Sequence, residues 1–314
     1  MKIAIVGAGA MGSLFGGHLA MAGTDVTLVD IDAAHVDAIC RDKLAMRVGE
    51  EEHKVAVKAT TDPADVGAVD AIVMFCKYRH TADAIRAAGL MIADDTVVWT
   101  LQNGLGNVDL IADAVPLDRI AKGLTSMTAV MEGPGRVATE FRGQSESFLW
   151  PAGGEPNAAM ERIVATFTAA GLPAYLDPDI DYRIWRKLVV NAGVTILSAA
   201  VNVGIGPVGE AEAGQRLLRA TTEEVVAVAQ AAGVPLDFDD AFGYLEELRE
   251  KAFTHVGSTT IDLQGGRPTE IDAMCGAVVR EGRRYGVPTP TNAVLTDIVK
   301  LIEETRQTRL PTPI

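Results

Sequence analysis

The 314-residue chain has few of the features that mark secreted, membrane-spanning or metal-binding proteins. Its three cysteines, Cys40, Cys76 and Cys275, form no CxxC pair and no even-numbered framework, which favours a reducing compartment. The histidines have no metal-binding spacing with one another or with the cysteines, so no metal site is predicted. No apolar run reaches the roughly 18 residues of a membrane span, and no basic region precedes a cleavable apolar segment. We therefore expect a cytoplasmic protein without a membrane partner.

Positive charge is also scarce. The chain has 28 Lys and Arg against 42 Asp and Glu, a formal net charge of -14. Such a charge disfavours nucleic acid and anionic membranes as partners. An anionic cofactor must then be held by local backbone amides and a few basic side chains. The hydrophobic content of 48% and charged content of 22% are typical of a soluble globular protein, and the length allows two domains.

The first thirty residues carry a glycine-rich motif. Ile3 to Val6 are four consecutive apolar residues, which suits a strand buried on both faces. Glycines at positions 7, 9 and 12 suit a tight turn, close approach of a pyrophosphate, and close packing of the next helix, about residues 10–22. The free N-terminal amides and the dipole of that helix point to the place where an anion would bind. The alternative is a purely structural glycine turn. The predicted dinucleotide site consists of Gly7, Ala8, Gly9, Ala10, Met11, Gly12 and Asp30, together with Lys77 and Asn103 further along the chain.

Asp30 ends the second predicted strand and stands eighteen positions after Gly12, near the spacing at which an acid binds the adenosine ribose. Its carboxylate would repel a 2′-phosphate by up to about 4 kcal/mol per unit charge at about 4 Å and an effective dielectric near 20. This favours NADH over NADPH. Two alternatives stay open: Asp30 only caps the next helix, although Asp32 could equally do so, or Arg41 and Lys43 form a phosphate pocket.

Strand and helix alternate in the first half of the chain. We predict a helix over 32–40, a hairpin of 44–48 with 55–59, a helix over 81–88, and buried strands over 71–75 and 96–100. This order implies an α/β fold with a parallel, doubly wound Rossmann-type sheet. Its ligands lie beyond the carboxyl ends of the strands, where Gly7, Lys77 and Asn103 fall.

The rest of this half is expected to complete the sheet. Residues 119–150 read as antiparallel additions, followed by a helix over 157–170 and a strand over 172–176. Beyond Asp177–Asp179 the periodicity is helical, with stops at Gly206–Pro207, Gly233–Pro235, Gly265–Gly266 and Gly286–Pro288. We therefore expect a dinucleotide-binding domain over residues 1–178 and an all-α domain over 179–314.

A polar stripe marks the helix that begins near Ile180. Lys187, Asn191, Thr195 and Ser198 are spaced by four, four and three residues and line one face, whereas apolar residues cover the rest. Such a helix should be buried with its stripe facing a cleft, where Lys187 is a candidate acid or substrate clamp. The alternative is a Lys that snorkels at a domain edge, with hydroxyls that bond back to the helix.

A second group of polar residues comprises Ser258 and Arg267–Asp272. Pro268 is expected to open a helix whose first turn contains Thr269, Glu270 and Asp272. Taken alone, these acids indicate only dipole stabilisation of a helix N-terminus.

With these residues in place, the whole chain resembles the ketopantoate reductases (2-dehydropantoate 2-reductases). The resemblance rests on the glycine motif, Lys77, Gln102-Asn103-Gly104, Trp185-Arg-Lys187 with Asn191, and Ser258 with Arg267-x-Thr-Glu270-Ile-Asp272. It implies NAD(P)H-dependent reduction of a small 2-oxo acid in pantothenate biosynthesis. By the same resemblance, Lys187 is the general acid and Glu270 binds the substrate hydroxyl. Asn103 and Lys77 lie between cofactor and substrate, and Asn191 and Ser258 hold the substrate.

Several positions depart from the family pattern. Thr195 and His255 stand in the expected substrate shell where the family tends to have Asn, and Ile261 and Cys275 replace a Gln and an Asn. Asp30 replaces the basic residue of NADPH-using members. A paralogue that reduces a different 2-oxo acid with NADH is therefore an alternative.

Two further alternatives remain. One is another dehydrogenase of the same two-domain plan, of 3-hydroxy acid or opine type. The other is a non-catalytic dinucleotide sensor, for which a proton donor such as Lys187 has no use. The sequence leaves open whether the helical domain also forms a homodimer.

Overall fold

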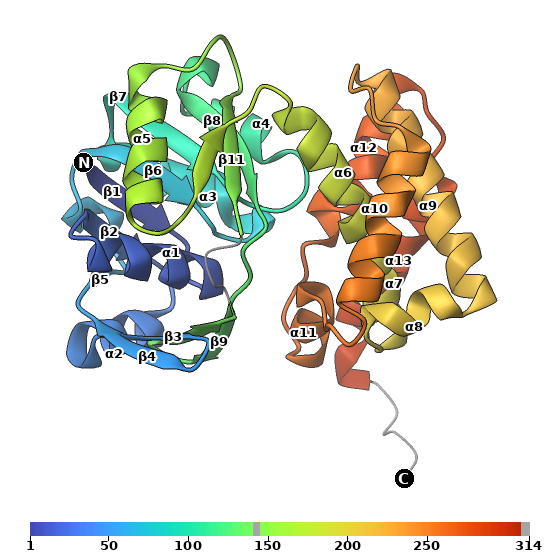
Figure 1. Cartoon of the computed structure of the whole chain (residues 1–314), viewed down its shortest axis with the longest axis horizontal. Coiled ribbons are helices and arrows are strands. Elements are labelled where there is room, and N and C mark those ends of the chain that lie inside the picture. Colours follow the sequence, from blue (N-terminus) through green and yellow to red (C-terminus); the bar gives the residue numbers. More distant parts are fainter. Residues whose placement is uncertain (141–144, 309–314) are drawn as a thin grey trace. The chain divides into compact units, whose positions relative to one another are not determined.

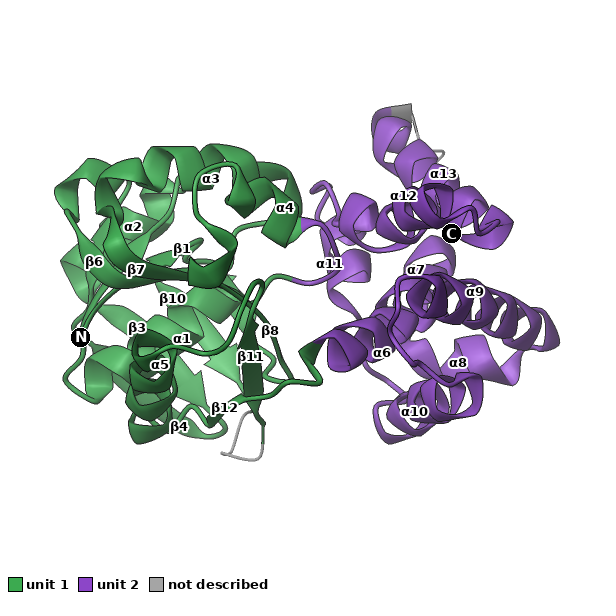
Figure 2. Ribbon diagram, turned by 90° about the horizontal axis from the view of Figure 1, so that it is seen from above, with its two compact units in different colours: residues 1–102, 107–180 green, residues 103–106, 181–314 purple. Residues whose placement is uncertain are grey.

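The computed structural model describes residues 1–140 and 145–308, which fall into two compact units (Figure 2). The first, here called the Rossmann unit, comprises residues 1–102 and 107–180. The second, the helical unit, comprises residues 103–106 and 181–314. The short segment 103–106 thus belongs with the helices, although residues 1–102 before it and 107–180 after it belong to the first unit.

The Rossmann unit is built on an eight-stranded sheet in the order β12-β11-β8-β7-β6-β1-β2-β5 (Figure 1). All pairings are parallel except that of β11 with β8. Because β1 lies between β2 and β6, the strand order reverses beside β1, where ligands of such sheets bind. The predicted doubly wound sheet is confirmed. Its strands are β1 (Lys2–Val6), β2 (Asp25–Val29), β5 (Lys58–Thr60), β6 (Val69–Met74), β7 (Ile92–Thr100), β8 (Ile120–Thr125), β11 (Ser147–Pro151) and β12 (Ala174–Leu176).

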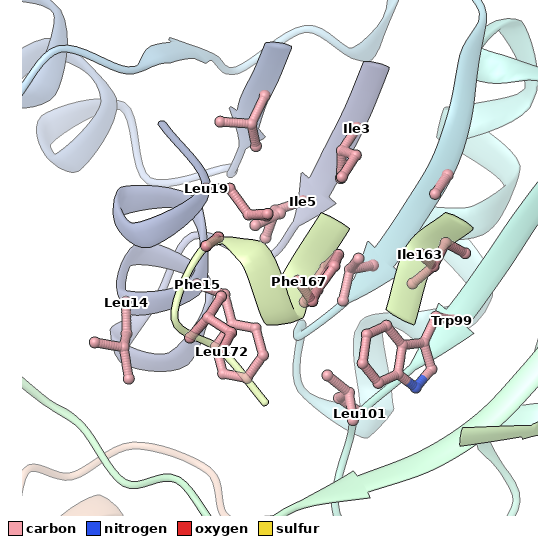
Figure 3. Packing of buried hydrophobic residues seen from close by; sticks show 14 of the residues in the cluster. Ile3, Ile5, Leu14, Phe15, Leu19, Trp99, Leu101, Ile163, Phe167 and Leu172 are labelled. Atoms are coloured by element: carbon pink, nitrogen blue, oxygen red, sulfur yellow. The ribbon is translucent and has the colours of Figure 1, made fainter. Parts of the chain in front are cut away.

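Both faces of the sheet are covered by helices. Ile3 and Ile5 of β1 pack in one apolar cluster with α1 (Ala10–Met21) and α5 (Ala158–Ala169). Ala4 and Val6 belong to a second cluster with α3 (Thr81–Ala87) and α4 (Asn107–Ala112). This alternation is why β1 is apolar at every position from Ile3 to Val6. Figure 3 shows the first cluster, in which Phe167 lies 5.0 Å from Trp99 and 6.1 Å from Phe15 between ring centroids.

A second sheet corrects two expectations. It has the order β4-β3-β10-β9 and comprises β3 (Leu44–Val48), β4 (Glu51–Val55), β9 (Val130–Gly133) and β10 (Arg136–Thr139). The hairpin partner of residues 44–48 is therefore 51–55, not 55–59, because Gly49 takes a left-handed φ of 59° and closes a tighter turn. Residues 130–139 also leave the main sheet, to which only β8 and β11 of the 119–150 stretch belong.

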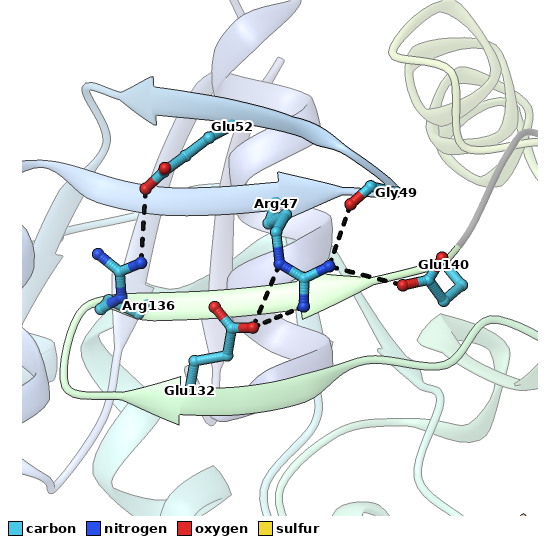
Figure 4. Close-up of polar contacts among 6 residues, drawn as sticks. All are labelled: Arg47, Gly49, Glu52, Glu132, Arg136 and Glu140. Carbon is cyan, nitrogen blue, oxygen red and sulfur yellow. Dashed lines mark hydrogen bonds and ion pairs between the residues drawn. The ribbon is translucent and has the colours of Figure 1, made fainter.

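The second sheet has one buried and one charged face. Leu44, Met46 and Val137 pack in the same cluster as α1. On the other face, Arg47 of β3 pairs with Glu132 of β9 at 2.6 Å, and Arg136 of β10 pairs with Glu52 of β4 at 3.5 Å, each across the strand that lies between them (Figure 4). The sequence shows the alternation of these strands but not which sheet they join, because that depends on the apolar surface of α1.

The helical unit has the predicted all-α character. Helices α6 (Ile180–Ala192) and α7 (Val194–Val201) contribute Leu188, Val189, Val194 and Ile196 to its core. The stretch 180–201 is long and apolar enough to cross a membrane, but 61% of its most apolar window is buried inside the structure, as expected for a core helix. The remaining helices are α8 (Ile205–Glu210), α9 (Glu212–Ala231), α10 (Phe238–Lys251), α11 (Ser258–Gln264), α12 (Cys275–Tyr285) and α13 (Pro290–Glu304).

Two predicted helix boundaries in this unit are wrong. Gly206 and Pro207 lie in the first turn of α8, where proline is tolerated, and α7 ends instead at the left-handed Asn202. Pro268 does not open an α-helix. Residues Ile271–Ala273 form one 3₁₀ turn, and the Ala273 carbonyl accepts a hydrogen bond from Leu105 N at 2.9 Å instead of continuing a helix. The stops at Gly233, Gly265 and Gly286 are confirmed.

Candidate active site

The glycine loop follows β1 and is held by close backbone contacts. Gly7 has a φ of 96°, and a Cβ there would lie 2.3 Å from the Cys76 nitrogen, after β6. A Cβ on Gly12 would lie 2.0 Å from the Gly7 oxygen. Larger residues at either position would push the loop away from β6 or α1 away from the loop. These two glycines therefore serve the turn and the helix packing that the motif predicted.

The N-terminal end of α1 fits an anion. Gly9 stands at the N-cap position, and a Cβ there would meet no atom within 4 Å among the residues that the structure describes. Ala10, Met11 and Gly12 bring no carboxylate to the first turn. The amides of this turn and the open space before Gly9 therefore fit the pyrophosphate of a dinucleotide.

Asp30 lies beside the glycine loop. Its Oδ2 accepts a hydrogen bond from Ala8 N at 2.6 Å, and its Oδ1 accepts one from Asp32 N at 2.9 Å. Asp32, not Asp30, caps α2 (Ala33–Asp42), since it accepts from His35 N. The alternative that Asp30 is only a helix cap is therefore wrong. A carboxylate with two such bonds keeps lone pairs for ribose hydroxyls.

The ends of β6 and β7 are tied together by a residue whose role the sequence did not reveal. Gln102 is buried, and its Nε2 donates to the Cys76 oxygen and the Thr81 hydroxyl, both at 2.7 Å. Lys77 follows directly after Cys76, is half-buried, and precedes the 3₁₀ turn Tyr78–His80. Gln102 thus fixes the backbone on which Lys77 is carried. The sequence signals are a polar residue two positions after a buried strand and its place in the Gln102-Asn103-Gly104 motif, neither of which reveals its partners.

Lys187, on α6, is brought together with two predicted site residues of the helical unit. Its Nζ donates to Asn103 Oδ1 at 3.1 Å. Desolvation of the ammonium lowers the pKa of Lys187 to about 8, and the nearby Glu270 carboxylate opposes this by favouring the charged form. Glu270 is itself buried, with 8% of its surface exposed. The side chain of Lys187 thus has the environment of a proton donor near neutral pH.

The segment 103–106 is fastened to the 3₁₀ turn after Glu270. Leu105 N donates to the Ala273 oxygen, and a Cβ on Gly104 would lie 2.0 Å from that same oxygen. Arg280 bridges the two pieces, because it donates to the Asp272 oxygen at 2.6 Å and to the Leu105 oxygen at 3.3 Å. Arg280 was missed from the sequence, since its partner Leu105 lies 175 positions away. These contacts place Asn103 and Glu270 around Lys187.

The polar stripe after Lys187 is not one straight face. Asn191 lies one turn further on α6 and is half-buried, but Gly193 then interrupts the helix. Thr195 is buried and packs against Gly257. A Cβ on Gly257 would lie 2.9 Å from Thr195 Cγ2. Ser198 is fully buried and donates to the Thr195 oxygen at 3.0 Å, so the alternative of a hydroxyl bonding back to the helix holds for Ser198.

The other predicted substrate residues surround α11. Ser258 is its first residue and is exposed. His255 is exposed in the connection before α11, so it is not helical, and its carbonyl accepts from Ile205 N at 3.1 Å. Cys275 lies in the core, where burial raises the pKa of its thiol and its Sγ donates to the Ala192 oxygen. Thr195, Ser258 and His255 are therefore neighbours in one part of the unit, whereas Cys275 acts as a small core residue.

Within residues 1–140 and 145–308, no group of three His, Cys, Asp or Glu side chains is placed to hold a metal ion. The two basic residues of the alternative phosphate pocket, Arg41 and Lys43, lie at the C-terminal end of α2. Arg41 pairs with Asp42 at 2.7 Å.

Comparison with known proteins identifies the chain's relatives. Two family models match it, described as ketopantoate reductase PanE/ApbA over residues 3–148 and its C-terminal part over residues 179–303. The 2-dehydropantoate 2-reductase of Halobacterium salinarum is 31% identical over 306 residues, which cover 96% of this chain and 99% of that protein. The chain belongs to the ketopantoate reductase family. It is accordingly an NAD(P)-dependent oxidoreductase that acts on CH–OH groups, of the type that reduces 2-oxo acids.

Solved structures extend the comparison. A ketopantoate reductase of this family from Ralstonia eutropha superimposes with a TM-score of 0.90 at 33% identity, covering 98% of this chain and 100% of that chain. A D-mandelate dehydrogenase in complex with NADH and anilino(oxo)acetate superimposes with a TM-score of 0.92 at 32% identity, with the same coverage. A protein with the same fold as this chain thus binds the nicotinamide dinucleotide NADH and carries the name of an enzyme other than ketopantoate reductase.

Proposed function

We propose that this protein reduces a 2-oxo acid to the 2-hydroxy acid with NADH, that Lys187 is the general acid, and that ketopantoate is the first substrate to test. The observation that carries the proposal is the Lys187 ammonium, held by Asn103 beside Glu270 with its pKa lowered to about 8. In this proposal residues 1–178 bind the dinucleotide and residues 179–314 bind the substrate. The site of action is the cytoplasm.

The residues of the two units have separate tasks in the mechanism. The amides of Gly9 to Gly12 and the Asp30 carboxylate would hold the dinucleotide, whose chemistry when bound is to supply a hydride for the 2-oxo carbon. The carbonyl π electrons move to oxygen, where negative charge develops, and Lys187 stabilises this charge and transfers its proton to that oxygen. Asn103 orients the ammonium, and Glu270 binds the substrate hydroxyl and favours the charged lysine. Asn191, Thr195, Ser258 and His255 form the rest of the substrate shell.

The rate of reduction should depend on the protonation of Lys187. Only the ammonium form can donate, so kcat/KM for the oxo acid should be level below about pH 7 and fall as pH rises through 8, to about 100-fold lower at pH 10. Oxidation of the hydroxy acid needs the neutral amine and should rise over the same range. The check is a pH profile of both directions, with dinucleotide saturating. A reduction rate that stays level to pH 10 would contradict the assignment.

Asp30 should decide the preference for NADH. Asp30→Asn keeps an oxygen that can accept from Ala8 N but removes the charge that repels a 2′-phosphate. We expect the ratio of the NADPH and NADH dissociation constants to shift by at least about tenfold toward NADPH, a value reduced from the Coulomb limit by solvent screening. Titrations of both cofactors measure this. Asp32→Asn is the matched control, since it removes an equal charge two positions after Asp30. An equal shift of the dissociation-constant ratio in both variants would mean that Asp30 does not determine the cofactor preference.

The direct test is the steady-state rate of the purified protein with ketopantoate, with NADH and NADPH compared at equal concentration. Rapid turnover places the protein in pantothenate synthesis, and the better cofactor tests the assignment of Asp30. Cofactor binding without turnover of ketopantoate leads to a panel of other 2-oxo acids. Binding without turnover of any of them would favour a dinucleotide sensor and contradict the proposal.

A second candidate is an NADH-dependent 2-hydroxy acid dehydrogenase with another substrate. It is favoured by the D-mandelate dehydrogenase that superimposes with a TM-score of 0.92. It also agrees with the altered residues Thr195 and His255 in the expected substrate shell. Phenylglyoxylate belongs in the same panel, and a kcat/KM for it well above that for ketopantoate would decide for this candidate.

A further inference from the structure

A buried network of hydrogen bonds links the turn between β9 and β10 to the Ala8 carbonyl of the glycine loop. His35 on α2 is 2% exposed, and Ser13 in the first turn of α1 is fully buried. His35 Nε2 lies 3.1 Å from Ser13 Oγ, and Ser13 Oγ donates to the Ala8 oxygen at 2.6 Å. The other ring nitrogen, Nδ1, accepts from Gly135 N at 2.9 Å.

The donor and the acceptor of each hydrogen bond in this network can be assigned. The Gly135 amide can only donate, so His35 Nδ1 must be the acceptor and the neutral ring carries its proton on Nε2. Ser13 Oγ then accepts from Nε2–H and uses its own single proton for the Ala8 carbonyl. Gly135 lies in the turn between β9 and β10 and is itself held, because its carbonyl accepts from Ala45 N at 2.8 Å. The second sheet thus sets the tautomer of His35.

The consequence falls on the peptide between Ala8 and Gly9. Its carbonyl points back to the buried Ser13, and because a trans peptide is planar, the Gly9 N–H points the opposite way, out of the buried network. The preceding peptide is held as well, since Ala8 N donates to Asp30. Ala8 therefore has both of its backbone polar groups bonded, and the loop is arranged before a ligand arrives.

We propose that His35, acting through Ser13, orients the Ala8–Gly9 peptide so that the Gly9 N–H faces the dinucleotide pyrophosphate. His35 and Ser13 are positioning residues for cofactor binding. This inference rests on the proposed dinucleotide site. It assigns a task to two buried residues that the proposed mechanism does not otherwise use. Without these two residues the loop would have to become ordered when the cofactor binds, which would lower the affinity for the cofactor.

The test measures NADH affinity separately from turnover. Ser13→Ala removes the hydroxyl with little change in packing, and His35→Leu removes both ring bonds. Each should raise the NADH dissociation constant about 3- to 10-fold, the range for one lost hydrogen bond, while kcat at saturating NADH changes less than about twofold. The double variant should bind NADH no more weakly than the weaker-binding single variant, because both substitutions act on the same Ala8–Gly9 peptide. His35→Gln, which offers one donor and one acceptor, should recover part of the affinity.

Thr96→Val is the matched control. Thr96 is fully buried in β7, at the end of the sheet away from the glycine loop, and its hydroxyl donates to the Val69 oxygen at 2.6 Å. The variant should lower the melting temperature without changing NADH affinity. Ser13→Ala protein that binds NADH like the wild type, or losses that add in the double variant, would overturn the inference alone. Wild-type protein that binds neither NADH nor NADPH would overturn the proposed function with it.

Discussion

Lys187→Ala protein is expected to lose at least about 100-fold in kcat for oxo-acid reduction, and up to about 10⁴-fold, the range for removal of a general acid. The loss arises because the variant has neither the proton nor the positive charge that Lys187 brings to the developing alkoxide. NADH affinity should stay within about twofold, since the glycine loop and Asp30 belong to the Rossmann unit. Steady-state rates at saturating NADH and a titration of NADH check the two parts separately.

A second substitution separates charge from proton transfer. Lys187→Arg keeps a cation but cannot donate a proton near neutral pH, so it should remain far below the wild type. A small primary amine added to Lys187→Ala should restore part of the rate if only the proton donor is missing. Lys251→Ala is the control, because Lys251 is an exposed lysine of α10 in the same unit, paired with Glu247. Near-normal turnover of Lys187→Ala would remove Lys187 from the mechanism.

The parts that could be predicted from sequence are those specified by neighbours in the chain. The strand before Gly7, the helix that begins at Ala10 and the acid at Asp30 lie within thirty residues, and each carries its own steric or electrostatic demand. Lys187, Asn103 and Glu270 are different. The polar stripe made Lys187 a candidate acid or substrate clamp, but the roles of Asn103 and Glu270 came from resemblance to a family. The structure adds that Asn103 and Glu270 surround one ammonium.

What could not be predicted depends on contacts between distant segments. His35 and Gly135 are 100 positions apart, and nothing in either segment marks the other as its partner. Pro268 reads locally as a helix start, but the Ala273 carbonyl is taken by Leu105. Gly206–Pro207 reads locally as a helix stop, but Gly206 allows Phe253 to pack against α8, since a Cβ there would lie 2.3 Å from its ring. In each case a tertiary contact overrides the local preference.

Gly104→Ala should impair catalysis almost as strongly as the loss of Lys187 itself. The added Cβ would lie 2.0 Å from the Ala273 oxygen, so the segment 103–106 must move by at least about 1 Å to reach an ordinary contact. That segment carries Asn103, whose side-chain oxygen holds the Lys187 ammonium at 3.1 Å. A displacement of about 1 Å in a positioned catalytic group can cost about 100-fold in rate. We therefore expect kcat/KM for the oxo acid to fall by about two orders of magnitude.

The control for this variant must carry the same backbone strain without the clash. Gly104 has a φ of 79° and Gly233, after α9, has a φ of 87°, so alanine costs about 1–2 kcal/mol of conformational strain at either position. A Cβ on Gly233 would meet no atom within 4 Å in the described part of the chain. Gly233→Ala should therefore lose only the stability that the left-handed φ costs, less than Gly104→Ala loses, and keep wild-type kcat and KM. If both variants remain equally active, the contact between residues 103–106 and Ala273 does not position Asn103 for Lys187.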